Sequence, residues 1–297
     1  MRFWKHSPYD GLMLLPTTLQ MGIFLWLAFT WDQRSWLQIG LLAPVAVFLA
    51  WHNPIMTTHN FIHLPWFAWK PLNRLYSAVN SINLCMPQIL YRYQHLNHHR
   101  FANDRIGEGG KTKDYSSTYA DGRDGRHEHV VPYCMLALVK PRTSTALWEA
   151  LAKEPGQYWF EQAVCLTGVT CFLLLSWQFF LVFYLPVVYL GWCLAHMENY
   201  YEHYGANPDN RYTDSVSHYG RVYNFFFFNE GYHQEHHLRP QAHWLERPKV
   251  REEFQGQLDT APRYVSKYPP MLAFLERRLK SSLPASASTA HSARSES

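Results

Sequence analysis

The chain has few cysteines and no closely paired ones. Five cysteines occur in 297 residues, and no two of them form a C-x-x-C pair. Zinc ribbons and iron–sulfur sites are typically built on such pairs, so neither is expected. A disulfide framework is not expected either, because Cys165, Cys171 and Cys193 fall in a long apolar stretch, where they would pack as reduced thiols.

Motifs for phosphate and nucleic-acid binding are also absent. The stretch GEGGKTKD at 107–114 is similar to a phosphate-binding loop, but that loop would need glycine where Arg105 stands. The net charge is only +4, and the basic residues are not interleaved with aromatic ones as in a nucleic-acid module. We therefore expect no nucleic-acid partner.

Charge is missing from three long stretches, at 11–31, 36–51 and 162–195. A membrane-spanning helix needs about 20 apolar residues, so the third stretch is too long for one span and fits two. We predict an all-α fold with four transmembrane helices in two hairpins, at about 11–31, 36–51, 160–176 and 178–197. A soluble protein with buried helices is the alternative. The second stretch is short, and its helix is expected to start at Ser35 and to run past Trp51.

Basic residues are distributed unevenly around these stretches. Twelve Lys and Arg lie in 52–156 and twelve follow the last stretch, whereas only Arg34 lies between the first two. The positive-inside rule then places both termini and a helical cap, at 52–156 and 198–280, in the cytoplasm. Region 72–91 carries Arg74 and several amides, so we expect it to be interfacial or re-entrant. The integral-membrane domain is predicted to cover 1–280, followed by a Ser/Ala-rich, disordered tail at 281–297. No secretory signal is expected, because the first apolar stretch is too long for one.

Histidines gather just outside the predicted spans, on the predicted cytoplasmic side. Spacings of i, i+4 and of i, i+3, i+4 place them on single helix faces. Imidazole binds Fe, Zn, Cu and Ni, and one ion takes four to six ligands, so nine histidines indicate two ions. Structural zinc would close at four ligands and would favour cysteine. The nine candidate ligands are His59, His63, His95, His98, His99, His203, His233, His236 and His237.

Other polar residues near the motifs are candidates for supporting roles. Carboxylates beside metal-binding histidines commonly accept a hydrogen bond from the imidazole, although each could equally be a surface charge. His196 is a spare ligand or a hydrogen-bonding neighbour of His203, and Asn199 lies one turn before His203. His6, His218 and His291 are expected at solvent or at interfaces. The carboxylate candidates are Asp104, Glu198, Glu202, Glu230 and Glu235.

These motifs, in this order, resemble the three histidine boxes of the membrane fatty acid desaturase superfamily. The boxes are H-x-x-x-H at 59–63 and H-x-x-H-H at 95–99 and 233–237. GYHQEHH at 231–237 is similar to the third box of desaturases, and NYYEHYG at 199–205 is similar to an extra motif of membrane alkane hydroxylases. The resemblance covers most of residues 10–255. It implies four spans, a non-haem centre of two irons held by the nine histidines, O₂ as cosubstrate, and a long-chain fatty acyl substrate taken from the bilayer. It also implies that Asn199 could hold an iron-bound water.

The resemblance leaves the reaction open, because desaturases, hydroxylases and a decarboxylase that makes terminal alkenes share the boxes. We predict a fatty acid desaturase, with decarboxylation to a terminal alkene and hydroxylation of an alkane or acyl chain as alternatives. A membrane metal- or haem-binding protein without catalysis is the alternative of another class. The sequence has no HPGG segment of cytochrome b5 and no rubredoxin-type cysteine pairs. Electrons are therefore expected from a separate ferredoxin, rubredoxin or cytochrome b5 with its reductase.

Overall fold

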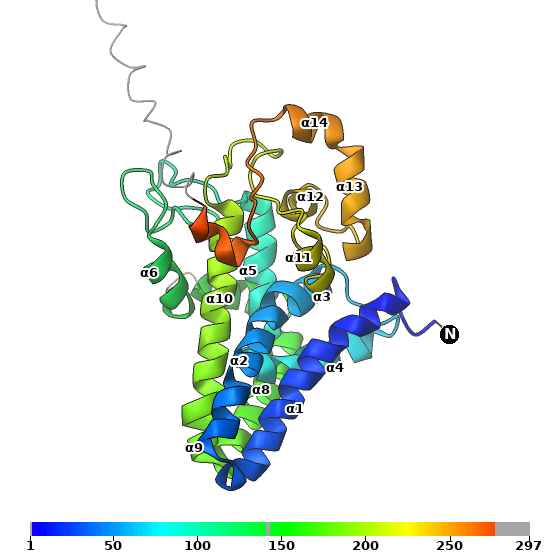
Figure 1. The fold of residues 1–297 in the computed structure, drawn as a ribbon, viewed down its shortest axis with the longest axis vertical. Helices are drawn as coiled ribbons and strands as arrows, with labels where there is room; N and C mark the ends of the chain where they lie inside the picture. Colours follow the sequence, from blue (N-terminus) through cyan, green and yellow to red (C-terminus); the bar gives the residue numbers. More distant parts are fainter. Residues whose placement is uncertain (1, 141–142, 277–297) are drawn as a thin grey trace, which may run out of the picture.

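The computed structural model describes residues 2–140 and 143–276, which form helices joined by loops (Figure 1). In these two ranges β structure is limited to two isolated bridges. The long helices run along the long axis of the molecule, and the short helices α11 to α14 gather at one end of it (Figure 1). The predicted tail at 281–297 lies outside the described residues.

Four continuous helical stretches are long and apolar enough to cross a membrane: Pro8–Gln33, Trp36–His63, Pro155–Leu175 and Trp177–His203. The predictions of an all-helical fold and of four spans are therefore confirmed. The first stretch consists of η1 (Pro8–Met13), α1 (Leu14–Thr30) and η2 (Trp31–Gln33), and the second of α2 (Trp36–His52), η3 (Asn53–Thr58) and α3 (His59–His63). The third is α8 (Pro155–Leu175), and the fourth consists of α9 (Trp177–Phe179), η5 (Phe180–Tyr184) and α10 (Leu185–His203).

The remaining described helices form the cap and one buried hairpin. They are α4 (Lys70–Leu84), α5 (Gln88–Phe101), α6 (Val130–Met135), η4 (Ala137–Val139), α7 (Thr143–Lys153), α11 (Arg221–Phe226), α12 (His233–Leu238), η6 (Trp244–Glu246), α13 (Arg247–Glu253), α14 (Gln255–Thr260) and η7 (Pro270–Leu275).

Serine side chains set both span-to-span turns. Ser35 begins α2 with a capping box, in which its hydroxyl accepts from the Gln38 amide and the Gln38 side chain accepts from the Ser35 amide. Ser176 ends α8 in an extended conformation, and its hydroxyl accepts from the Phe179 amide at the start of the next helix. A turn without glycine or proline is thus possible, because the serine satisfies a backbone donor that the new helix leaves free.

The second span is longer than the sequence indicated. As expected, its helix runs past Trp51. It continues to His63, beyond the predicted span bound at 51, so the first histidine motif lies on the end of the span itself. Pro54 lacks an amide hydrogen, and a proline inside a helix usually kinks it. It lies in the π-helical stretch Asn53–Thr58, whose wider turn accommodates the missing donor within a continuous helix.

Helices α4 and α5 form a hairpin whose tip lies inside the bundle. The turn is at Cys85, which has a φ of 55°. On either side of the tip, the Gln20 side chain of α1 donates to the Asn83 carbonyl at 3.1 Å, and the Trp192 indole of α10 donates to the Leu84 carbonyl at 2.9 Å. The hairpin therefore enters the bundle from the cap and returns to it, and α5 carries its histidines back to that end.

A network of buried amides holds this hairpin against the second span. The Asn80 side chain contacts the Asn53 side chain at 2.9 Å, the Thr58 hydroxyl at 2.9 Å and the Gln88 side chain at 2.8 Å. All four residues are buried, and buried amides in apolar surroundings need such partners. The network fixes α5 relative to the helix that carries His59 and His63.

Helix α10 crosses α2 at very short range. The contact lies at Gly191, where an added Cβ would come within 2.6 Å of the Ala50 carbonyl carbon. Aromatic rings of α1, α8 and the start of the fourth span, among them Phe24, Phe172 and Tyr184, fill the space between the spans further from the cap. The four spans therefore form one packed support for the histidine-bearing end.

Candidate metal centre

The nine predicted histidines converge in two buried or half-buried clusters. The ligand nitrogens of each cluster lie within 4.8 Å of one another. The five-histidine cluster is His59, His63, His95, His99 and His236, and the four-histidine cluster is His98, His203, His233 and His237.

Histidines that are adjacent in the sequence belong to different clusters. His98 and His99 are adjacent on α5, and His236 and His237 are adjacent on α12, yet each pair divides between the clusters. Successive residues on a helix point about 100° apart, so one H-H dipeptide can serve two sites. The H-x-x-H-H motifs are thus what places the clusters side by side.

The spacing of the nitrogens fits ligands of one ion. In the five-histidine cluster, Nε2 atoms face each other at 2.7 Å between His59 and His236, 3.0 Å between His63 and His95, and 2.8 Å between His95 and His99. Two nitrogens bound at about 2.1 Å and at right angles would lie roughly 3.0 Å apart. A hydrogen bond would need a proton on one nitrogen of each pair, and a cycle of shared nitrogens satisfies this poorly.

In the four-histidine cluster the Nε2 atoms also face one another, at slightly longer distances. His98 Nε2 lies 2.9 Å from His203 Nε2, and His233 Nε2 lies 3.3 Å from the same atom. The Nε2 of His237 is buried without a hydrogen-bond partner. A buried nitrogen lone pair without a donor is costly unless it binds a cation, so this donor set also fits a metal ion.

Burial keeps most of the imidazoles neutral. It lowers the pKa of His95, His99, His236 and His237 well below the usual value, and neighbouring imidazoles add to this effect. Burial also lowers the pKa of His233 to about 4. Neutral imidazole is the metal-binding form, so these side chains present lone pairs at physiological pH.

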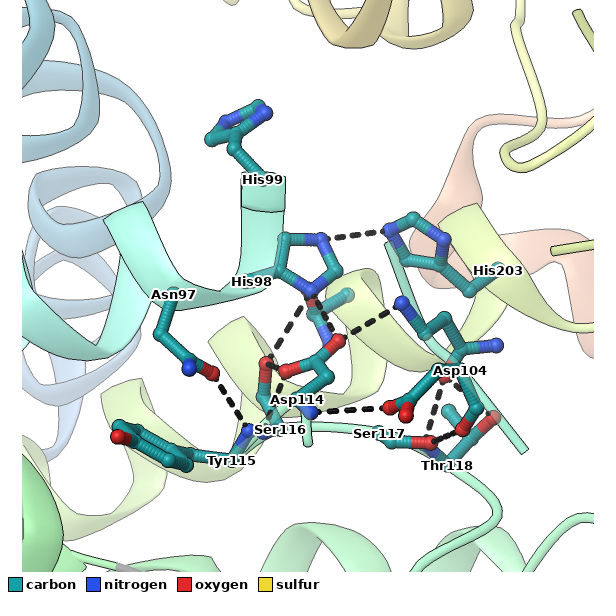
Figure 2. Close-up of polar contacts among 12 residues, drawn as sticks. Asn97, His98, His99, Asp104, Asp114, Tyr115, Ser116, Ser117, Thr118 and His203 are labelled. Atoms are coloured by element: carbon teal, nitrogen blue, oxygen red, sulfur yellow. Dashed lines mark hydrogen bonds and ion pairs between the residues drawn. The ribbon is translucent and has the colours of Figure 1, made fainter. Parts of the chain in front are cut away.

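Asp114 orients His98 through the ring nitrogen that points away from the cluster. Its Oδ2 lies 2.7 Å from the Nδ1 of His98, on the side away from His203 (Figure 2). Burial alone would raise the pKa of Asp114, but His98 and hydrogen bonds from Ser116 outweigh it and lower that pKa. The ionised carboxylate therefore accepts the Nδ1 proton, and the Nε2 lone pair of His98 points toward the cluster.

A polar loop holds Asp114 in place. The Asp104 carboxylate accepts from the backbone amides of Lys113 and Asp114, and the Asn97 side chain accepts from the Tyr115 amide (Figure 2). Asp104 thus supports the centre through the loop, one step further from the imidazoles than the sequence suggested.

Glu230 and Arg247 form a second support. Glu230 Oε1 lies 2.9 Å from His59 Nδ1, and its Oε2 accepts from Arg247 at 2.5 Å. Both side chains of this ion pair are almost fully buried. Burial would raise the pKa of Glu230, but Arg247 and His59 together hold it well below the usual range. The carboxylate is therefore charged and can orient His59.

The other candidate carboxylates divide into two groups. Glu202 lies 3.4 Å from His233 Nδ1 and joins Glu230 and His233 in a third group of possible ligands. Glu235 instead accepts from the Ser217 and Tyr219 hydroxyls, and Glu198 accepts from the Trp51 indole and the Tyr223 hydroxyl. In the described contacts, these last two carboxylates hold cap helices and do not touch an imidazole.

A small inner cavity adjoins the clusters. Its volume is about 50 Å³, enough for a few water molecules or O₂. Asn199 and His196 line it, next to the imidazoles of His59, His95 and His233. Neither residue belongs to the two clusters. The Asn199 side chain donates to the Tyr133 hydroxyl at 2.7 Å. The other lining residues include Ile55, Tyr91, Trp192 and Ala195, which give the cavity an apolar wall.

Three supporting residues were missing from the sequence interpretation. They are Asp114, Arg247 and Asp214, whose backbone carbonyl lies 2.9 Å from His203 Nδ1. Asp114 is followed by Ser116, a pattern that indicates a local turn but not a partner. The expectation that His218 lies at solvent or an interface is wrong, because this residue is buried and its Nδ1 lies 3.1 Å from the Ser266 carbonyl.

Fold and site together define a class: helical proteins with four membrane-length spans and polyhistidine clusters at one end of the bundle. A family model described as fatty acid desaturase matches residues 34–269, and the chain belongs to this family. It is 24% identical over 261 residues to a protein of Oryza sativa subsp. japonica named sphingolipid delta(4)-desaturase DES1-like, covering 82% of this chain and 72% of the other. It is 25% identical over 274 residues to the sphingolipid delta(4)-desaturase of Candida albicans (strain SC5314 / ATCC MYA-2876), covering 84% and 70%. The resemblance seen in the boxes is therefore confirmed as family membership.

Proposed function

We propose that the chain is an O₂-dependent, non-haem di-iron oxidase that introduces a double bond into a long-chain fatty acyl substrate. The observation that carries the proposal is the pair of clusters, whose nine imidazole nitrogens converge on two points beside one cavity. Membership of the desaturase family supports it. The names of the relatives favour desaturation over the hydroxylation and decarboxylation that the same boxes allow.

The donor set fits iron. Nine imidazoles without a cysteine thiolate suit Fe(II) and leave positions for O₂, whereas structural zinc sites close at four ligands and usually include cysteine. His59, His63, His95, His99 and His236 would hold one iron, and His98, His203, His233 and His237 the other. When bound, the two irons would supply the reduction of O₂, with two external electrons, and the removal of two hydrogens from the chain.

The protein itself orients the imidazoles and lines the site with apolar side chains that exclude water. The carboxylates of Asp114 and Glu230 accept hydrogen bonds from Nδ1 of His98 and of His59, which directs the Nε2 lone pairs toward the clusters. Ile55, Trp192 and Ala195 would hold an apolar chain against the clusters. Asn199 and Glu202 offer polar groups for a water molecule beside the centre. An unactivated C–H bond has no acidic proton, so no nucleophile–base pair is required.

Metal analysis tests the metal proposal. We expect close to two irons per chain, and little zinc, in protein produced with adequate iron. Elemental analysis by mass spectrometry with Mössbauer spectroscopy checks both the number and the pairing of the irons. A folded sample that holds one equivalent of zinc and no iron would contradict the proposal.

Single substitutions test the nine ligands. Replacing any one of them by alanine should abolish turnover, because ligands of one centre act as a unit. His6→Ala is the matched control and should retain activity within a few-fold. Near-normal activity in two or more of the nine variants would overturn the assignment.

Product analysis tests the reaction. The protein should be expressed in a host that supplies a ferredoxin, rubredoxin or cytochrome b5 with its reductase, and lipids and volatiles should be profiled by mass spectrometry. Unsaturated acyl chains that depend on His98 and His237 are the expected product. Hydroxylated chains or 1-alkenes would assign one of the two alternative reactions instead.

A further inference from the structure

A second cavity, here called the outer cavity, lies outside the metal centre. Its volume is about 560 Å³, which lies within the range of roughly 300–1,000 Å³ typical of small-ligand sites. Its lining is mainly aromatic and aliphatic. The residues that matter for the argument are Phe48 of α2, Arg221, Tyr223 and Phe226 of α11, Phe227, and Met271 of η7.

The outer cavity opens on an apolar surface. Val222 and Phe226 line it with 74% and 59% of their surface exposed, and the neighbouring Phe225 is 78% exposed. Such a cluster of exposed apolar side chains marks a contact surface. Phe48, on the second span, is 42% exposed and lies 6.2 Å from Phe227, ring centre to ring centre. The surface therefore continues the exposed apolar side of the span, so a lipid of the bilayer is the occupant that its position favours.

Arg221 provides a positive charge at the mouth of this cavity. It begins α11 and is exposed. Across 2–140 and 143–276 no hydrogen bond, ion pair or ring contact of its guanidinium is found, in contrast to the paired Arg239, Arg251 and Arg263 of the same cap. A long basic side chain at a membrane interface keeps its charge in water while its stem lies on apolar surface. An apolar cavity with one unpaired cation matches a ligand with one apolar chain and one negative charge.

The outer cavity is a near neighbour of the inner cavity. The Tyr223 hydroxyl donates to Glu198 on α10, and the Trp51 indole donates to the other carboxylate oxygen at 2.8 Å. The next residues of α10, Asn199 and Glu202, line the inner cavity. The group Trp51–Glu198–Tyr223 thus connects the outer cavity, which Tyr223 lines, to helix α10, which lines the inner cavity.

We propose that the outer cavity binds a long-chain fatty acid anion from the bilayer, with its carboxylate at Arg221 and its chain against Phe226, Phe227 and Met271. Its role as a loading site for the inner cavity rests on the proposed oxidase function. The binding itself does not. A neutral phospholipid filling the cavity as ordinary surrounding lipid is the competing occupant, and the experiment separates the two.

The test is photo-crosslinking in nanodiscs, without an electron donor, so that no turnover is needed. A fatty acid with a mid-chain diazirine is added, and the crosslinked peptides are mapped by mass spectrometry. Labelling should concentrate in 221–227 and 269–272. Arg221→Gln should weaken it by about tenfold, the size of one lost charge-assisted hydrogen bond. Val222→Glu, at an exposed site that folding tolerates, should also weaken it, by repelling the carboxylate.

Lys249→Gln is the matched control, because it removes an exposed cation of the same cap away from the cavity lining and should leave labelling unchanged. Equal labelling of the same peptides by a diazirine phosphatidylcholine would overturn the proposal in favour of ordinary lipid. Labelling in Arg221→Gln equal to that in Lys249→Gln, or labelling confined to other peptides, would also overturn it. Because labelling needs no turnover, a failed oxidase assignment and a failed binding site give different results.

Discussion

The Nδ1 atom of His98 lies 2.7 Å from Oδ2 of Asp114, and the Nε2 atom of the same ring lies 2.9 Å from Nε2 of His203. One imidazole therefore joins a buried carboxylate to the four-histidine cluster. The arrangement fixes both the rotation of the ring and the position of its proton, so the effect of Asp114 on the cluster can be predicted.

Asp114→Asn should weaken metal binding in the four-histidine cluster. An amide in place of the carboxylate can present its NH₂ group to Nδ1, which favours the wrong tautomer of His98. Loss of such a supporting partner typically costs about 10- to 100-fold in metal affinity. We expect iron content to fall toward one per chain under dilute chelator, measured by elemental analysis. Asp32→Asn, at an exposed site in the turn between the first two spans, is the control and should keep the normal content. Equal iron in the two variants would contradict this role.

Arg247→Met should destabilise the protein because it leaves the Glu230 charge buried and uncompensated. Breaking a buried ion pair from one side costs about 3–5 kcal/mol. The double variant Glu230→Gln, Arg247→Met should be less damaged than the sum of the two single variants, because neither charge remains. Denaturation of the wild type, the two single variants and the double variant in detergent gives the four free energies of unfolding for a double-mutant cycle. Arg239→Met removes one member of an exposed pair with Glu253 and should change stability by no more than about 1 kcal/mol. Strict additivity of the Glu230 and Arg247 effects would show that the two are not coupled.

Gly191→Ala should lower the melting temperature because the new methyl group meets the backbone of α2 at Ala50. Backbone atoms cannot move aside as a flexible side chain can, so the helices must separate, at a cost of about 1–3 kcal/mol. Gly40→Ala is the matched control, since its Cβ meets nothing within 4 Å and alanine favours a helix. Thermal unfolding of both variants in the same detergent measures the difference. A Gly191→Ala protein as stable as Gly40→Ala would show that the close crossing is not required.

Cysteine labelling tests the membrane orientation. Four crossings would put both termini and the cap on one side, and the excess of basic residues predicts that this side is the cytoplasm. In a background without native cysteines, Arg123→Cys should react only after the membrane is permeabilised. Gln33→Cys, in the turn between the first two spans, should react in intact cells with an impermeant reagent. Lys267→Cys, after the last box, should react from the same side as Arg123→Cys. Labelling of these two sites from opposite sides would separate the histidine motifs and end the argument for a shared centre.

Periodicity accounts for most of what the sequence predicted correctly. Charge-free stretches located the four spans, and the spacing of the histidines predicted stripes on single helix faces. Both are local properties, since they depend only on residues within a few turns of one another. The split of His98 from His99 follows from the same helical geometry, which turns adjacent side chains apart.

What the sequence could not predict depends on contacts between distant segments. Asp114 meets His98 only because a loop folds back under α5, and Arg247 reaches Glu230 from a helix that begins after the third box. No period in the sequence marks either residue. The end of the second span was also missed, because the amides and histidines that follow Trp51 are polar. They are nevertheless buried, since neighbouring helices supply their hydrogen bonds.

The π-helical stretch Asn53–Thr58 has a consequence for how this second span tolerates insertion and deletion. A π-helical turn contains one residue more than an α-helical turn, so the stretch behaves as a one-residue insertion within the span. Removing that residue would restore regular α-helix and leave the residues beyond it on the faces that they now occupy, because the wider turn already absorbs the extra residue. His59 and His63 would then still face α5, and Ala50 would keep its contact with α10. A one-residue deletion within Asn53–Thr58 therefore preserves the phase between the part of the span that packs in the bundle and the part that carries ligands. The same deletion in the regular helix before it would turn His59 and His63 by about 100°.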